Sequence, residues 1–245
     1  MNIAFIGFGK VAYTLSRLIK SQDIHFSTST ENRSKGTVDL INKANIEVFD
    51  SFSEALKNAD IIISTVTPSK AVEVADKYSA FCNGIYLDLN NISPNTTKQI
   101  DNLVDNFVDG AIIGKIDSKT PTLFLAGKNA DKLKFLNDFL NVTIVSDKIG
   151  DASKLKLLRS TYTKSVSVLL IETYGLAKKL DLDEEFFDNL SITEGDDFKE
   201  KSLSRINNTL KSSKRKAEEL EEILNYFNDD ELDMVKAAMD KLKQF

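Results

Sequence analysis

The chain has 245 residues, of which 42% are hydrophobic, and a formal net charge of −5 at pH 7. This length allows a sizeable core in one large domain or two modest ones, and the negative charge argues against a general nucleic-acid or acidic-membrane binder. A single cysteine, Cys82, excludes an internal disulfide and a cysteine-based metal cluster, and no apolar run is long enough to span a bilayer. We therefore expect a cytoplasmic protein that binds neither nucleic acid nor membrane and holds no metal.

The N-terminus begins with a strand, a glycine turn and a helix. Residues 3–6 are an unbroken apolar run, and Gly7-x-Gly9-x-x-Ala12 follows at once. In a dinucleotide site the first glycine permits the tight turn, the second leaves room for a pyrophosphate, and the small third residue lets the helix lie close to the strand. The phosphates then meet the free N–H groups at the start of the helix. The predicted cofactor-binding residues here are Gly7, Phe8, Gly9, Lys10 and Val11.

Strands and helices alternate through the first half of the chain. After the first strand and helix we predict strands at 24–29, 46–49, 60–66, 85–88, 107–109, 122–126 and 142–146, and helices at 37–44, 53–58, 70–81 and 131–140. The connections are too long for hairpins, so this alternation indicates a mostly parallel sheet wound on both faces. The predicted fold is an α/β fold of the Rossmann type.

The residues after the second strand bear on which nicotinamide cofactor is used. Arg33 can face a ribose 2′-phosphate with a forked charge, while Thr30, Asn32 and Ser34 supply neutral hydrogen bonds. This favours NADP over NAD. Glu31 argues the other way, because a carboxylate that points inward selects the ribose hydroxyl and repels the phosphate.

Three further strand ends carry candidate residues. Val66 ends the strand at 60–66, and Thr67 and Pro68 follow it at the carboxyl edge of the sheet, where ligands bind in such folds, although a proline there also simply stops a strand. Asp88 and Asp109 end predicted strands, so turn or cap roles are at least as well supported as catalysis.

The composition changes near Gly150. All three prolines and eight of the ten glycines lie at or before that position. We predict helices at 152–180, 184–190, 197–210, 214–227 and 230–243, the last two with one apolar stripe each. The expected domains are therefore a cofactor-binding domain at 1–150 and a smaller all-helical domain at 151–245.

The long helix predicted at 152–180 has two different faces. One line of residues is apolar, at positions 155, 158, 162, 166 and 169. A second line carries Lys156, Ser160, Lys164 and further hydroxyl groups, and residues 152–171 contain no acidic residue. This second line is either the wall of a polar cavity or one face of an ordinary amphipathic helix. A lysine in such a cavity could pass a proton to or from a carbonyl or alkoxide oxygen.

Four segments, in the expected order, resemble the β-hydroxyacid dehydrogenases, which include 3-hydroxyisobutyrate and 6-phosphogluconate dehydrogenases. They are the 7–12 turn, the segment from Asp88 through Asn90 and Ser93 to Pro94, the segment from Asp109 to Gly114, and Gly150-x-Ala152-x-x-x-Lys156. The resemblance implies that Lys156 is the catalytic lysine, that Asn90 lies beside both nicotinamide and substrate, and that Ser93, Gly114, Ser160 and Lys164 shape the substrate pocket. It also implies a homodimer formed through the helical domain.

Departures from the family pattern concern the residues around the substrate. Lys115 stands where the family usually has a second glycine, and Arg159 and Ser160 stand where an asparagine is usual. The closest resemblance is to a branch with a short helical C-terminal domain. We expect an NADP-dependent oxidoreductase that acts on a small hydroxy acid or related carbonyl compound. The alternatives are an imine or pyrroline-type reductase and a nucleotide-sensing module without turnover.

Overall fold

The computed structural model describes residues 1–228 and 230–245. The chain divides into two compact units, Met1–Lys156 and Leu157–Phe245, and the division falls inside one long helix, α6 (Asp151–Lys179). The expected boundary after residue 150 lies just before this helix. Among the described helices, none combines the length and the apolar character that crossing a membrane requires.

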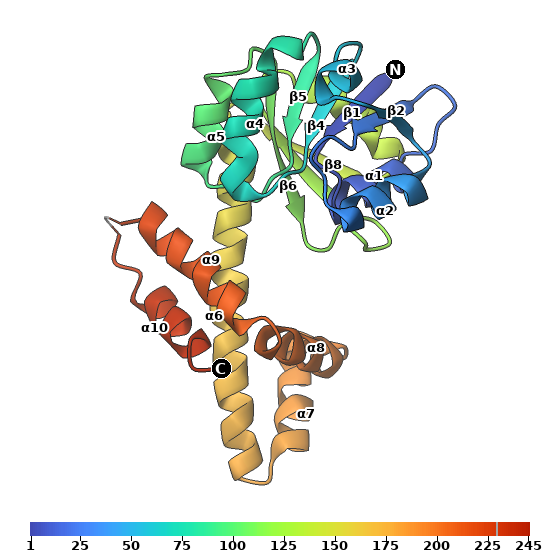
Figure 1. Cartoon of the computed structure of the whole chain (residues 1–245). Coiled ribbons are helices and arrows are strands. Elements are labelled where there is room, and N and C mark those ends of the chain that lie inside the picture. The colour runs from blue at the N-terminus through green and yellow to red at the C-terminus, as the bar shows by residue number, and fades with distance from the viewer. Residues whose placement is uncertain (229) are drawn as a thin grey trace. The chain divides into compact units, whose positions relative to one another are not determined.

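The first unit, every residue of which is described, is built on an eight-stranded sheet with strand order β3-β2-β1-β4-β5-β6-β7-β8 (Figure 1). Each pair of neighbours is parallel except β6 and β7. This mostly parallel sheet confirms the predicted Rossmann-type fold. The strands are β1 (Asn2–Ile6), β2 (His25–Ser29), β3 (Glu47–Phe49), β4 (Ile61–Ser64), β5 (Ile85–Asp88), β6 (Phe107–Ile113), β7 (Thr122–Ala126) and β8 (Asn141–Ser146).

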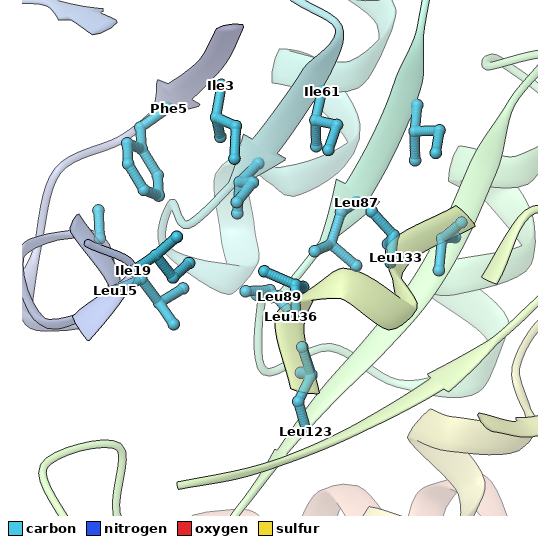
Figure 2. Packing of buried hydrophobic residues seen from close by; sticks show 14 of the residues in the cluster. Ile3, Phe5, Leu15, Ile19, Ile61, Leu87, Leu89, Leu123, Leu133 and Leu136 are labelled. Carbon is cyan, nitrogen blue, oxygen red and sulfur yellow. The ribbon is translucent and has the colours of Figure 1, made fainter. Parts of the chain in front are cut away.

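Helices cover both faces of this sheet because successive strand residues point to opposite sides. Ile3 and Phe5 belong to one core cluster, shown in Figure 2, together with residues of α1 (Lys10–Leu18), α2 (Lys35–Ala44) and the 3₁₀ segment η3 (Ala130–Asp138). Ala4 and Ile6 belong to a second cluster on the other face. That cluster includes residues of α3 (Phe52–Leu56), α4 (Ala71–Tyr78) and α5 (Pro94–Asp101), and short 3₁₀ segments, η1 (Pro68–Lys70) and η2 (Ser79–Phe81), flank α4.

The structure corrects two predicted elements and adds one that was not predicted. The segment predicted as a helix at 131–140 is the 3₁₀ segment η3, and α5 was not predicted. The strand predicted at 107–109 continues to Ile113, because β6 changes partner along its length. It pairs with β5 up to Asp109 and with β7 from Asp109 onward, so its second half extends past the level where β5 ends.

The second unit consists of helices around two small cores. Beside α6 they are α7 (Asp183–Glu194), α8 (Phe198–Leu210), α9 (Ser213–Tyr226) and α10 (Asp233–Leu242). Val168 of α6 packs with apolar residues of α9 and α10, and Leu170 packs with Phe187 of α7 and Ile206 of α8. The stripes predicted on the last two helices are buried here, with Leu220 and Leu242 almost fully so.

Candidate active site

The glycine turn between β1 and α1 contains two glycines that are needed for different reasons. Gly7 has φ +84°, and a Cβ there would lie 2.6 Å from the carbonyl oxygen of Thr65. The Thr65 hydroxyl donates to the Gly7 carbonyl at 2.8 Å, so the turn is held against the end of β4. Gly9 has φ −93°, and a Cβ built on it meets nothing within 4 Å. The fold therefore demands Gly7, whereas Gly9 leaves open space above the N-terminus of α1, as a pyrophosphate requires.

The other predicted residues of this turn divide between core and surface. The Phe8 ring lies in the core, edge-on to Phe5 at 5.6 Å between ring centroids, so only the backbone of Phe8 can serve a ligand. Val11 packs partly against the same core. Lys10 begins α1, and its ammonium lies 2.7 Å from Asp117 in the segment after β6, an exposed pair. Val66 packs against Gly7 from the β4 side, and exposed Thr67 and Pro68 follow it.

The segment after β2 presents cationic and neutral groups at the N-terminus of α2. The Ser34 hydroxyl caps this helix by accepting from the Thr37 N–H. Arg33 donates from Nε to the backbone oxygen of Glu31 at 2.9 Å, and its guanidinium lies 5.1 Å from the centre of the Phe52 ring. Among the described residues, Arg33 forms no ion pair with a carboxylate.

Glu31 has a structural task in this segment. Its Oε2 accepts from the Phe52 N–H at 3.1 Å, at the start of α3. The carboxylate that argued for NAD in the sequence is thus occupied by another helix. The backbone oxygen of Thr30 accepts a hydrogen bond from the Arg33 N–H, which closes the turn. Asn32, within this turn, has φ +55°. Lys35, which was not among the predicted residues, begins α2 directly after Ser34. A basic residue at the first position of a helix with no acid in its first turn is the sequence signal that marks it as a further candidate.

A buried polar cluster lies where β4 and β5 end. The Asn90 backbone N–H donates to Asp88 Oδ1 at 2.8 Å, and Asn90 Nδ2 donates to Asp88 Oδ2 at 2.7 Å and to Ser64 Oγ at 2.9 Å. Asp88 is 2% exposed and Asn90 is 5% exposed. Asn90 Oδ1 and the hydroxyl of Tyr86 are buried without a hydrogen-bond partner. Asp88 therefore accepts the hydrogen bonds of a turn, which is one of the roles considered for it, and two polar atoms of the cluster have no hydrogen-bond partner.

Burial has the largest effect on the pKa of Asp88 in this cluster. It raises the pKa of Asp88 to about 7, against the hydrogen bonds from Asn90, which lower it. Two further charges act on Asp88: Asp109 raises its pKa and Lys156 lowers it. Lys156, in the second turn of α6, thus lies within electrostatic range of the end of β5, and it is half-buried. A lysine and a carboxyl group with a perturbed pKa at the edge of such a sheet are typical of an active site.

Asp109 has the cap role that was considered for it. Its Oδ2 accepts from the Ser153 N–H at 3.0 Å and its Oδ1 from the Ser153 hydroxyl at 2.6 Å, and the nearby backbone N–H groups of Gly150 and Ala152 also favour its ionised form. Burial raises the pKa of Asp109, and these donors lower it. The Ser153 hydroxyl is also 3.2 Å from that of Thr97 in α5. The start of α6, and with it Lys156, is thereby fixed to β6 and α5.

The structure places two further predicted substrate residues in the first unit. Ser93 caps α5 through a hydrogen bond from the Thr96 N–H. Gly114 directly follows β6, is exposed, and has φ +85°. Because Asp109 is level with Asp88 and Gly114 comes five residues later, Gly114 lies well beyond the end of β5 along the extended part of β6.

In the second unit, α6 buries its polar line. Lys164 is 7% exposed, and its ammonium lies 2.7 Å from Glu219 of α9. The hydroxyls of Thr163 and Ser167 donate to carbonyls one turn earlier. The line is thus packed by a neighbouring helix, and the predicted substrate roles of Lys164 and half-buried Ser160 stay predictions. On the apolar side of α6, Leu158, Tyr162, Leu169 and Leu176 of the second unit are exposed, as are Leu155 in the first unit and Leu180 directly after the helix.

Among the described residues, no three His, Cys, Asp or Glu side chains gather as a metal ion would need.

Comparison with known proteins agrees with this geometry. Residues 2–91 match the sequence model of a family described as NADP oxidoreductase, coenzyme F420-dependent. An uncharacterised 28.5 kDa protein of Methanothermus fervidus is 39% identical over 226 residues, which cover 91% of this chain and 89% of that protein.

Solved structures extend the likeness over the whole chain. A conserved protein of unknown function, described as structurally similar to 3-hydroxyacid dehydrogenases, is 33% identical with a TM-score of 0.87, covering 100% of this chain and 96% of that one. The 3-hydroxyisobutyrate dehydrogenase of Mycobacterium tuberculosis, solved with L-serine, shares the fold at 17% identity and a TM-score of 0.79, covering 100% and 93%. An imine reductase from Pseudomonas sp. also shares the fold, at 13% identity and a TM-score of 0.66, covering 99% and 92%. The resemblance drawn from the four sequence segments is therefore confirmed, and the chain belongs to the 3-hydroxyacid dehydrogenase-like family.

Proposed function

We propose that this protein is an NADP-dependent oxidoreductase that transfers a hydride between the nicotinamide and a small hydroxy acid or related carbonyl compound. The observation that carries the proposal is the contrast between the two glycines of the first turn. Gly7 is required by the fold, but the space at Gly9 serves no contact within the protein. Because this open space lies at the N-terminus of α1, where free backbone N–H groups can bind a phosphate, it points to a ligand there.

The residues present fit a dinucleotide. The backbone from Gly7 to Val11 would hold the pyrophosphate, and Arg33, with Thr30, Asn32 and Ser34, would hold the 2′-phosphate. Lys35 adds a second positive charge beside Arg33. The nicotinamide half would lie against Val66, Thr67, Pro68 and Asn90, which follow β4 and β5.

Lys156 is the proposed proton donor or acceptor for the substrate oxygen. A bound nicotinamide supplies the acceptor or donor of the hydride. The substrate oxygen loses a proton when an alcohol is oxidised and gains one when a carbonyl is reduced, and Lys156 would hold that proton. Asn90, Ser93 and Gly114 are the proposed substrate contacts of the first unit. Retention of a lysine at this position favours catalysis over a sensing role without turnover.

Calorimetry with NADPH and NADH tests the cofactor assignment. We expect NADPH to bind at least tenfold more tightly than NADH, and Arg33→Ala to remove about 1.4 kcal/mol or more of that preference. Gly9→Ala should weaken both nucleotides at least tenfold at unchanged stability. Gly175→Ala is the matched control, because a Cβ there also meets nothing within 4 Å and the residue lies in the second unit. If wild type binds neither nucleotide, the proposed function is wrong.

A substrate screen with the preferred nucleotide then separates the enzyme alternatives. Turnover of hydroxy acids supports the proposed reaction, whereas an amine-forming activity would assign the chain to the imine reductases that share its fold. With any substrate found, we expect Lys156→Ala to lower kcat by about 10²- to 10⁴-fold. An unchanged kcat would remove Lys156 from the mechanism.

A further inference from the structure

The amide of Asn90 is held in one orientation by partners that use up its donors. Both hydrogens of Nδ2 are engaged, one by Asp88 Oδ2 and one by Ser64 Oγ. The remaining polar atom, Oδ1, is buried and has no partner. A buried acceptor without a hydrogen bond costs free energy, so its retention points to a donor that arrives from outside the chain.

Asp88 decides which way this amide faces. An ionised carboxylate only accepts hydrogen bonds, so it admits Nδ2 beside it and repels Oδ1. Ser64 cannot make this choice, because a hydroxyl both donates and accepts. The Asn90 backbone N–H binds the other oxygen of Asp88 and fixes the carboxylate itself. The orientation of the amide thus follows from the charge of Asp88.

The position of this amide suits the nicotinamide end of a dinucleotide. Ile6, at the end of β1, pairs with Ser64, and Ser64 pairs with Asp88 at the end of β5. The glycine turn follows Ile6, so the clamped amide lies two strands away from it, about 10 Å across the sheet. In a fold of this type the second half of the nucleotide extends from the turn over these neighbouring strand ends.

We propose that Asp88 is a positioning residue that locks the Asn90 amide with Oδ1 as the unpaired acceptor, so that the end of β5 takes the carboxamide N–H of the nicotinamide when the nucleotide binds. This inference rests on the proposed function and specifies which groups the site binds. It binds a ligand group that donates a hydrogen bond, and it does not bind one that can only accept. The hydrogen bond forms on binding, as is usual for active sites observed without their ligands.

Two oxidised cofactors that differ only in this donor provide the test. NADP⁺ carries the carboxamide, and its 3-acetylpyridine analogue has a methyl group in place of the NH₂. At about pH 8 we expect calorimetry to give wild type a Kd for the analogue about tenfold above that for NADP⁺. Asp88→Asn should reduce this ratio to about twofold, because a neutral amide accepts either orientation of Asn90. Asp60→Asn is the matched control, since Asp60 also accepts a backbone N–H, from Asn2, and should keep the ratio.

A pH series on wild type tests Asp88 without relying on a variant that folds. Protonation below about pH 7 turns the Asp88 carboxyl into a donor, which releases the amide, so the ratio should fall toward about twofold at about pH 5.5. The groups that face Asp88 are Asp109 on β6, Lys156 on α6 and Tyr86 on β5; burial raises the pKa of the Tyr86 phenol, which stays protonated. Both probes carry the same phosphate and ring charge, so other titrations cancel in the ratio.

Each outcome decides the inference. A ratio of about ten in wild type that falls in Asp88→Asn and at low pH supports it. Equal binding of both probes by wild type overturns it and leaves the proposed function standing, whereas binding of neither overturns both. An Asp88→Asn protein that keeps the full ratio, or a ratio that does not change with pH, shows that Asp88 does not set the orientation.

Discussion

The two units of the chain leave different kinds of group without a partner. In the first unit the unmatched groups are two buried polar atoms, the Tyr86 hydroxyl within β5 and Asn90 Oδ1 just after that strand. In the second unit, apart from Ser165 Oγ, every buried polar side-chain atom that the structure describes has a partner, and the unmatched groups are exposed leucines of α6. The unmatched groups of the first unit therefore call for a hydrogen-bonding ligand, and those of the second unit call for an apolar surface.

The largest expected effect concerns the buried ion pair of the second unit. Glu219→Gln leaves the Lys164 ammonium buried without its carboxylate, which we expect to lower the free energy of unfolding by about 2 to 3 kcal/mol, discounted because the Glu219 side chain is a quarter exposed. Urea denaturation measures the change. The control is Glu73→Gln, which breaks an exposed pair with Lys70 and should cost less than about 0.5 kcal/mol. Equal costs would mean that the second unit does not depend on this pair.

The next effect concerns the polar edge of the first unit and its dependence on pH. The pKa of Asp88 is raised in the folded protein to about 7, so the folded state holds a proton that the unfolded state has released. This favours folding at low pH, and the benefit is lost as the pH rises from about 4 to about 7. From about pH 5 to about pH 8 the unfolding free energy of wild type should therefore fall by roughly 2 kcal/mol relative to that of Asp88→Asn, which lacks this titration. Denaturation at both pH values measures this, and a constant difference would contradict it.

A smaller effect concerns the exposed stripe of α6. We propose that a second copy of the chain covers it, because Tyr162, Leu169 and Leu176 recur every seven residues, the spacing of a helix–helix seam. Leu169→Glu should weaken the homodimer at least tenfold, about 1.4 kcal/mol, with little change in protomer stability. Sedimentation velocity over a concentration series measures the association. Ile192→Glu is the control, because Ile192 is exposed on α7. A wild-type protein that stays monomeric throughout would disprove the proposal.

The fold could be predicted because the sheet is parallel and covered on both faces. Such strands are continuous apolar runs, and Ile61, Ile62 and Ile63 show the pattern plainly. The course of β6 could not be predicted in the same way. Residues 110–113 pair with β7 rather than β5. This change from a parallel to an antiparallel partner depends on where β7, which comes later in the chain, packs.

The candidate site could be predicted only where one segment determines the chemistry. Gly7 and Gly9 lie within a single turn, so their spacing predicted the geometry of that turn, and their cofactor roles stay predictions. The task of Glu31 could not be foreseen, because its partner Phe52 is 21 residues away. Lys164 is a similar case, since Glu219 lies 55 residues further along the chain. Periodicity found both lines of α6, but which line is buried depends on the helices that pack against it.

The hydrogen bonds of Asp109 have a consequence for any attempt to divide the protein. A cut after residue 150 would remove Ser153, whose N–H and hydroxyl both bind this carboxylate. The excised piece would then bury a charge with too few donors, and it would have to protonate the carboxyl group or open that end of the sheet. A fragment of residues 1–156 keeps the donors. The shortest self-sufficient N-terminal fragment must therefore end inside the long helix rather than before it.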